Sequence, residues 1–333
     1  MGVYGVKRLL MIEKGKVIIM SNANEIQLKA PLFRDPIYDS ATDPTIIWNK
    51  DEKQWYLFYT QRRAVEPIIG YAWIHGTDIG VASSKDGSKW LYRGTLPNLA
   101  IEPGHNTFWA PEIIWARGEY HMYVTYITGV PNDWDYERWI LHYTSDDLWN
   151  WKYQSRLDLD TDRAIDVCVY EIESGLWKMW FKNECKNSHT YTATSNDLYH
   201  WEPSGVEIDD CPQEGPNVFE LGGYKWMISD FWSGLAVYRS DDFTKWVRQE
   251  NILESSGTRK MDQGLGHHAD VLVRGERAYI FYFCHPYSGD DGDHAWGKQH
   301  TEVQRAKAVV QVAELKVNNG ILTCDRNANV TWL

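Results

Sequence analysis

Several common patterns are missing from this 333-residue chain. No stretch of about 18 apolar residues occurs, so the sequence predicts no membrane-spanning helix. The five cysteines are scattered, odd in number and without a C-x-x-C pair, so neither a disulfide framework nor a zinc site is indicated. Long helical periodicity and linkers rich in Pro, Gly or Ser are absent too. We therefore expect one all-β domain over residues 1–333, with residues 1–35 as a lead-in.

Positive charge is also scarce. The chain has 34 Lys and Arg against 46 Asp and Glu, a formal net charge of -12. Such a surface attracts neither nucleic acid nor an anionic membrane, so neither is expected as a partner and an uncharged ligand fits better. The N-terminus has no sustained apolar run, which predicts a cytoplasmic protein as given, or a secreted or periplasmic one if a signal peptide has been removed. The sequence does not indicate an oligomeric state.

Aromatic residues are abundant, with 18 Trp and 20 Tyr. Large aromatic rings with a polar tip suit a surface on which sugar rings stack their apolar faces, although many of these rings are expected to pack in the core instead.

A repeat of short strands runs five times along the chain. Its strands are rich in Tyr, Trp, Val and Ile, and four of its copies close on the phrase Ser-x-Asp-x-x-x-Trp, in which Asp favours a turn and Trp anchors the next strand. The four copies begin at Ser84, Ser145, Ser195 and Ser240. Four-stranded repeats of roughly 40 to 50 residues predict a five-bladed β-propeller. A strand at Lys16–Met20 is expected to pair with the last blade and hide its edge.

Three repeats open with a carboxylate, namely Asp43, Asp166 and Glu214, at what are predicted to be equivalent places. The innermost strands of a propeller begin close together at one end of the channel, so these side chains are expected to meet. A glycosidic bond is hydrolysed by one carboxylic acid and one carboxylate, which this set supplies. The alternatives are structural: a turn cap, a buried acceptor and an ion pair. Asp35, which also precedes a proline, competes with Asp43.

Five motifs, one per repeat, resemble those of the five-bladed propeller glycoside hydrolases of family 43, which are related to families 32, 68 and 117. They are Asp43-Pro44, Trp109-Ala110-Pro111-Glu112, Ile165-Asp166-Val167, Glu214-Gly215-Pro216 and Gly266-His267-His268. The resemblance covers roughly residues 35–325. It implies that Asp43 is the general base, Asp166 the pKa modulator and Glu214 the general acid, with inversion of configuration. It implies no required cofactor and no protein metal site, and leaves open a calcium ion near His268.

Other residues are expected to contact substrate because they lie in loops or at strand starts. They are Arg62, Trp73, His75, Trp109, Glu112, Lys182, Trp232 and His268. Glu112 stands where the family often has an aspartate. The His267-His268 pair and His189 leave open a histidine acid, as in family 117.

The predicted function is therefore an exo-acting, inverting hydrolase of a neutral plant or algal oligosaccharide. A carbohydrate-binding propeller without catalysis is the alternative from another class. A sugar phosphorylase is a weaker one, because it needs a basic phosphate pocket.

Overall fold

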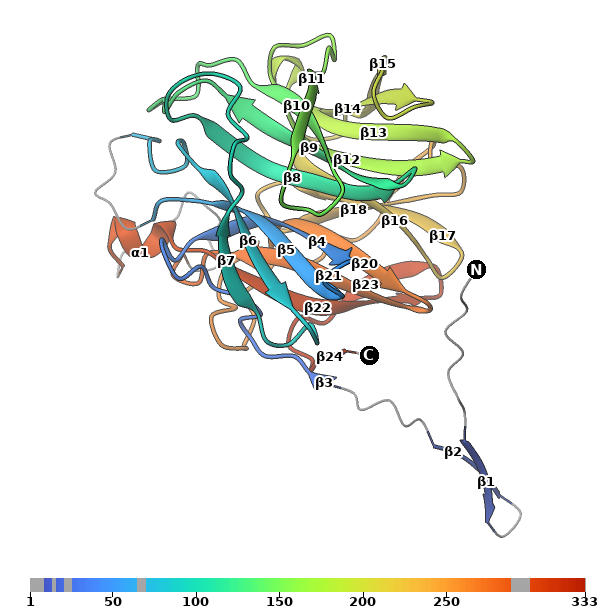
Figure 1. Cartoon of the computed structure of the whole chain (residues 1–333). Coiled ribbons are helices and arrows are strands. Elements are labelled where there is room, and N and C mark those ends of the chain that lie inside the picture. Colours follow the sequence, from blue (N-terminus) through green and yellow to red (C-terminus); the bar gives the residue numbers. More distant parts are fainter. Residues whose placement is uncertain (1–8, 14–15, 21–25, 65–69, 289–299, 333) are drawn as a thin grey trace.

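The computed structural model describes residues 9–13, 16–20, 26–64, 70–288 and 300–332. Five four-stranded antiparallel sheets surround a central axis, each with its strands in chain order from the axis outwards. The innermost strands β4, β8, β12, β16 and β20 contact one another in a closed ring. The expected all-β, five-bladed propeller is thereby confirmed (Figure 1).

The bounds of the blades are as follows. Blade 1 comprises β4 (Ala41–Asn49), β5 (Gln54–Gln61), β6 (Asp78–Ser84) and β7 (Leu91–Thr95), and blade 2 comprises β8 (Thr107–Ala116), β9 (Glu119–Ile127), β10 (Trp139–Ser145) and β11 (Lys152–Arg156). Blade 3 comprises β12 (Ala164–Glu173), β13 (Leu176–Asn183), β14 (His189–Ser195) and β15 (Glu202–Ile208), and blade 4 comprises β16 (Glu214–Leu221), β17 (Tyr224–Asp230), β18 (Leu235–Ser240) and β19 (Val247–Arg248). Blade 5 comprises β20 (His267–Arg274), β21 (Arg277–Cys284), β22 (Val309–Asn318) and β23 (Ile321–Cys324). The described helical elements are η1 (Glu184–Lys186) and α1 (Glu302–Ala306), and no described helix is long and apolar enough to cross a membrane.

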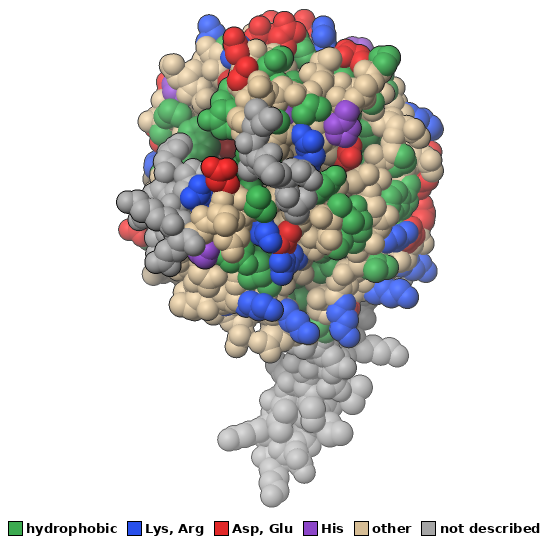
Figure 2. Space-filling view, turned by 90° about the vertical axis from the view of Figure 1, so that its left-hand side faces the viewer, with side chains coloured by type: hydrophobic (Ala, Val, Ile, Leu, Met, Phe, Trp, Pro, Cys, Tyr) green, Lys and Arg blue, Asp and Glu red, His purple; other side chains and the backbone are tan. Residues whose placement is uncertain are grey.

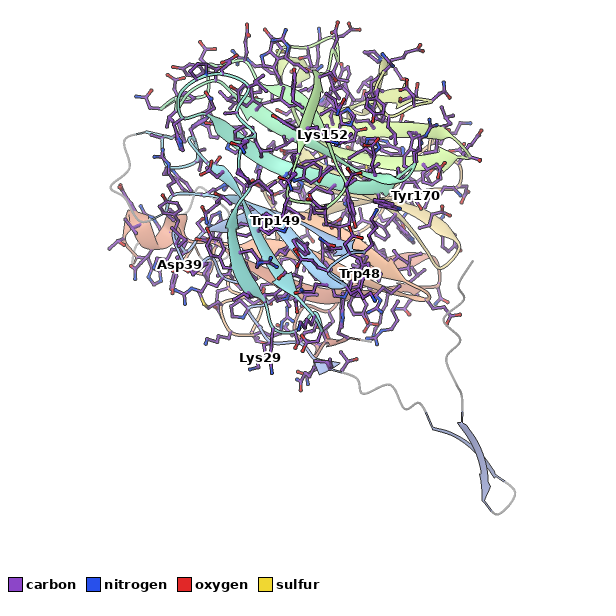
Figure 3. The ribbon with its side chains drawn as sticks, viewed as in Figure 1. Lys29, Asp39, Trp48, Trp149, Lys152 and Tyr170 are labelled. Carbon is purple, nitrogen blue, oxygen red and sulfur yellow. The ribbon has the colours of Figure 1, made fainter. Side chains whose placement is uncertain are left out.

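The repeated Ser-Asp-Trp phrase builds the turn between the third and fourth strands of a blade. In blade 2 the Asp147 carboxylate accepts hydrogen bonds from the backbone N–H groups of Trp149 and Asn150, at 2.8 Å each. Trp151 is buried, and its indole N–H donates to the Leu148 carbonyl at 3.1 Å. Trp149, labelled in Figure 3, reaches across to blade 1, where its indole N–H donates to the Tyr56 hydroxyl at 3.1 Å. The phrase therefore has the structural role predicted for it.

Two strands from opposite ends of the chain pair beside the junction of blades 5 and 1, and neither is the strand predicted to pair there. β2 (Lys16–Met20) pairs with β1 (Leu9–Glu13) rather than with the last blade, because only two residues separate the two strands in the sequence and their pairing costs little chain entropy. A different pair, β3 (Ile26–Gln27) and β24 (Thr331–Trp332), joins the two ends beside the seam between blades 5 and 1. Trp332 packs edge-on against Trp55 with ring centroids 5.3 Å apart, so the C-terminal segment is anchored in the core of blade 1.

Candidate active site

A pocket of about 430 Å³ opens at the end of the channel where the innermost strands begin. Asp43, Asp166 and Glu214 all line it, so the structure brings together the three carboxylates predicted from the sequence. Each comes from a different blade: β4, β12 and β16.

A bulge near the start of the innermost strand places the aspartates. In β4 and β12 the pairing register with the second strand shifts at Asp43 and at Asp166. Both residues adopt left-handed backbone angles, with φ of 51° and 56°. Such a conformation is unusual for a residue with a side chain, although Asp tolerates it better than most, and a bulge re-aims the side chain it carries. The two aspartates thus occupy equivalent positions in two blades.

Glu214 does not occupy that position, and here the predicted equivalence was wrong. The left-handed bulge residue of blade 4 is Gly215, with φ of 54°, and that of blade 2 is Ala110, with φ of 45°. Glu214 precedes its bulge residue and is therefore the counterpart of Trp109. The prolines carry the signal for this offset, since Pro44, Pro111 and Pro216 each follow the bulge residue directly.

Asp166 is buried close to several other charged side chains. Burial raises its pKa to about 7, helped by the negative charges of Glu214 and Asp43, while His268 and Lys182 act in the opposite direction. The group is therefore expected to carry a proton at mildly acidic pH.

Asp43 is held in the pocket by its neighbours. Its Oδ2 accepts a hydrogen bond from the Thr42 hydroxyl at 2.9 Å and lies 3.8 Å from the Arg62 guanidinium. The Nδ1 atom of His268 lies 3.7 Å from Asp43 Oδ1 and 3.8 Å from Asp166 Oδ2, so this ring stands between the two aspartates.

Asp35, the competitor of Asp43, lies outside the pocket and has a structural role. Its Oδ1 accepts from the backbone N–H groups of Ile37 and Tyr38. Its Oδ2 accepts from the Tyr59 hydroxyl at 2.5 Å and the Gln61 amide at 2.6 Å.

Glu214 accepts a hydrogen bond at each of its oxygens. The Lys182 ammonium lies 2.8 Å from Oε2, and the Trp232 indole N–H donates to Oε1 at 3.0 Å. Lys182 also lies 3.1 Å from Glu184. Burial alone lowers a lysine pKa, but the charges of Glu214 and Glu184 more than offset it and raise the pKa of Lys182 above its usual range. Lys182 and Trp232 thus hold the Glu214 carboxylate in place from both of its oxygens.

The eight predicted contact residues do not all line the pocket. Five of the eight line the pocket: Arg62, Trp73, Trp109, Lys182 and Trp232. His268 stands between the aspartates. His75 is fully buried behind the wall, with its ring 5.0 Å from that of Trp109, and burial lowers its pKa.

Glu112 is placed elsewhere, which corrects its predicted position. It lines a second cavity further along the channel with Asn217 and Asp270, and it accepts from the Val169 backbone N–H at 2.9 Å. Burial, together with the charge of Asp270, raises its pKa to about 8. It lies two residues beyond Ala110, and each residue of a strand advances the chain by about 3.3 Å, so Glu112 lies deeper in the channel than the bulge.

Asp230, which was not predicted from the sequence, lines the pocket with Glu214. It is the strand partner of Glu214, and its Oδ2 accepts from the backbone N–H of His268 at 3.0 Å and lies 3.0 Å from Nδ1 of His267. His267 lines the pocket as well. Asp230 ends the strand that follows the Glu214 motif. Antiparallel pairing of these two strands could therefore have placed Asp230 opposite Glu214.

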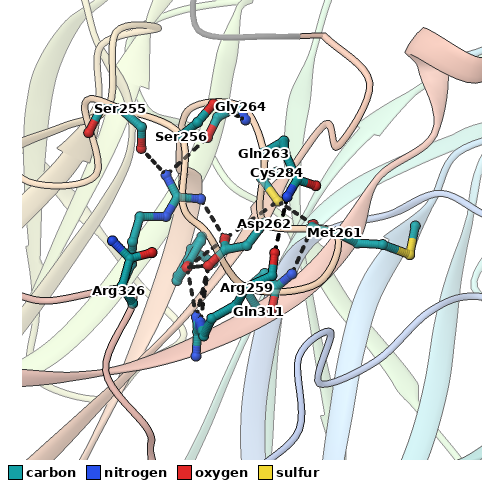
Figure 4. Close-up of polar contacts among 12 residues, drawn as sticks. Ser255, Ser256, Arg259, Met261, Asp262, Gln263, Gly264, Cys284, Gln311 and Arg326 are labelled. Carbon is teal, nitrogen blue, oxygen red and sulfur yellow. Dashed lines mark hydrogen bonds and ion pairs between the residues drawn. The ribbon is translucent and has the colours of Figure 1, made fainter.

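A buried polar network supports the loop that leads into β20 (Figure 4). The Asp262 carboxylate accepts from the Arg326 guanidinium at 2.5 Å, from the Arg259 guanidinium at 3.0 Å and from the Tyr282 hydroxyl at 2.9 Å. Arg326 also donates to the Gly264 carbonyl at 2.9 Å. These bonds fix the backbone just before the two histidines of blade 5.

Among the described residues, no group of three or more His, Cys, Asp or Glu side chains is arranged to hold a metal ion. The possible calcium ion near His268 stays a prediction.

The five-bladed propeller fold is similar to that of solved glycoside hydrolases of family 43. The solved structures agree in fold. A thermostable family 43 glycoside hydrolase has a TM-score of 0.63 and 17% identity, covering 88% of this chain and 96% of that one. A GH43 β-xylosidase/α-arabinofuranosidase from a compost microbial metagenome has a TM-score of 0.67 and 13% identity, covering 90% and 98%. A GH43 β-1,3-galactosidase has a TM-score of 0.65 and 13% identity, covering 91% and 100%.

Similarity in sequence is more restricted. The uncharacterized protein MT1551 of Mycobacterium tuberculosis (strain CDC 1551 / Oshkosh) is 29% identical over 166 residues, which are 45% of this chain and 55% of that protein. Rv1502 of strain ATCC 25618 / H37Rv, also uncharacterized, is 28% identical over 165 residues. The chain thus spans about half the length of the curated relatives it matches. No protein-family profile matches the chain.

Proposed function

We propose that this protein is a glycoside hydrolase that cleaves a neutral oligosaccharide in an exo fashion with inversion of configuration. The observation that carries the proposal is the pocket in which Asp43, Asp166 and Glu214 meet from three blades. Hydrolysis with inversion needs an acid at the leaving oxygen and a base at the attacking water. The face in Figure 2 carries acidic, basic and apolar side chains side by side rather than one continuous basic surface, which favours an uncharged ligand.

In the proposed reaction the Asp43 carboxylate takes a proton from water as the water oxygen attacks the anomeric carbon. Glu214 gives its proton to the departing glycosidic oxygen. The negative charge of Glu214 helps burial to raise the pKa of Asp166 to about 7, so Asp166 can carry a proton near neutral pH. A substrate that opens the Lys182 contact allows Glu214 to take that proton, and Asp166 then becomes the charged partner. This is the role of a pKa modulator.

The test is a screen of 4-nitrophenyl glycosides and of plant and algal oligosaccharides with wild type and Glu214→Gln. Loss of the acid should lower turnover by a factor of about 10² to 10⁴ without unfolding the protein. Glu207→Gln is a matched control, because Glu207 lies 2.7 Å from the Lys178 ammonium and accepts from the Trp246 indole at 2.8 Å, yet does not line the pocket. Equal activity in wild type and Glu214→Gln would refute the assignment of Glu214.

A second candidate uses a histidine as the acid. The contact between Nδ1 of His267 and the Asp230 carboxylate favours it, since a carboxylate stabilises a protonated imidazole. His189 lies at the start of β14 and does not line the pocket. In this mechanism His267→Asn, rather than Glu214→Gln, abolishes cleavage. Binding of an oligosaccharide without cleavage by wild type would instead indicate the carbohydrate-binding class.

A further inference from the structure

Two loops from neighbouring blades meet at the mouth of the pocket. One precedes β6 in blade 1 and the other precedes β10 in blade 2. The Tyr71 backbone N–H donates to the Asn132 carbonyl at 3.0 Å. Gly70 allows this approach, because it has φ of 57° and a Cβ there would lie 2.4 Å from the Asn132 carbonyl oxygen. Residues 70–74 of the first loop and the loop that precedes β10 therefore form one continuous wall.

Tyr71 and Trp134 present their rings on this wall. The ring centroids are 4.7 Å apart, and the residues are 44% and 43% exposed. Both line the same pocket as the three carboxylates. The pair is thus an exposed aromatic surface continuous with the candidate catalytic centre.

A buried arginine fixes the Trp134 loop. The Arg138 guanidinium donates to the carbonyls of Trp134 and Tyr136, at 2.8 and 3.0 Å, and lies 5.8 Å from the Trp134 ring centroid. Arg138 is only 1% exposed and pairs with Glu184 at 2.7 Å. Glu184 in turn contacts Lys182, the partner of Glu214. One ion-pair network therefore anchors both the aromatic wall and the candidate acid.

We propose that Tyr71 and Trp134 form a sugar-stacking subsite that holds the leaving-group side of the oligosaccharide. This inference rests on the proposed function and deepens it. Rigid, exposed aromatic rings present large apolar faces, which match the apolar face of a pyranose ring. In a pocket that takes the terminal sugar at its carboxylates, the next sugar lies at the mouth, against this wall. The subsite selects oligosaccharides over single glycosides.

The test compares two substrates of the same terminal sugar, an oligosaccharide and the glycosyl fluoride, which has no leaving sugar to stack. Trp134→Ala should lower kcat/KM for the oligosaccharide about tenfold and leave that for the fluoride within about twofold. Tyr71→Ala should act in the same direction. Trp115→Ala is the matched control, since Trp115 is also 43% exposed but packs edge-on against Tyr120 and does not line the pocket.

Three outcomes separate this inference from the proposed function. Cleavage that Trp134→Ala leaves unchanged, or lowers equally for both substrates, overturns the subsite while the hydrolase stands. If wild type cleaves nothing, oligosaccharide binding is measured by calorimetry, and binding that is lost in Trp134→Ala but kept in Trp115→Ala supports the subsite without the hydrolase. Absence of both cleavage and binding across the panel overturns both.

Discussion

Asp166 should make the stability of this protein depend on pH, in a direction that the structure fixes. A carboxyl whose pKa is about 3.9 in the unfolded chain and about 7 in the folded one binds its proton more tightly when folded. Its stabilising contribution is fully present below about pH 4 and is lost as the pH rises through 7. With 1.36 kcal/mol per pKa unit, three units correspond to about 4 kcal/mol lost between pH 4 and pH 8.

The Asp166→Asn variant removes this dependence, because the amide has nearly the same shape and no charge. The difference in unfolding free energy, variant minus wild type, should rise from near zero at pH 4 to about 4 kcal/mol at pH 8, although the variant should be catalytically impaired. Urea unfolding of wild type and Asp166→Asn at several pH values from 4 to 8 measures this difference in unfolding free energy. Asp146→Asn serves as the control. Asp146 is exposed, and its ion pair with the exposed Lys152, at 3.7 Å, should contribute little to stability at any pH. A difference between Asp166→Asn and wild type that stays constant with pH would refute this reasoning.

Two further variants probe the neighbours of Glu214. Lys182→Met removes the ammonium 2.8 Å from Glu214, which is also one of the charges that lower the pKa of Asp166. The pKa of Asp166 should therefore rise further, and the alkaline limb of the pH profile of kcat/KM should move up by about one unit or more; an unmoved limb contradicts this. Gly215→Ala places a Cβ 2.6 Å from the His268 ring at φ of 54°, and should lower the unfolding free energy by about 2 kcal/mol or more and reduce activity. Gly223→Ala, at φ of 82° with no atom within 4 Å of the added Cβ, should cost about 1 kcal/mol and retain activity, so equal effects of the two would contradict the steric argument.

The propeller could be predicted because its signals are local. Each blade carries its own strands and its own Ser-Asp-Trp turn, so four copies of one phrase and a fifth strand set suffice to count blades. The closure could not be predicted in the same way. It joins β3 to β24 from opposite ends of the chain, and two short strands with no repeated motif carry no signal for such a distant pairing.

The site was predictable only where it follows the blade repeat. Asp43 and Asp166 sit on equivalent bulges, so comparing repeats finds them, whereas the one-residue offset of Glu214 shows only when the prolines are aligned. Tyr71 and Trp134 come from loops that differ between blades. Their contact depends on loop packing around Gly70 and Arg138, which no repeat encodes.

The most direct test of the central claim is the anomeric configuration of the first-formed product, followed by proton NMR during hydrolysis of an oligosaccharide that the screen identifies. Acid and base action by Glu214 and Asp43 predicts that the inverted anomer appears first and that neither Glu214→Gln nor Asp43→Asn produces it at a comparable rate. A product that first appears with retained configuration, or undiminished hydrolysis by either variant, would contradict the account.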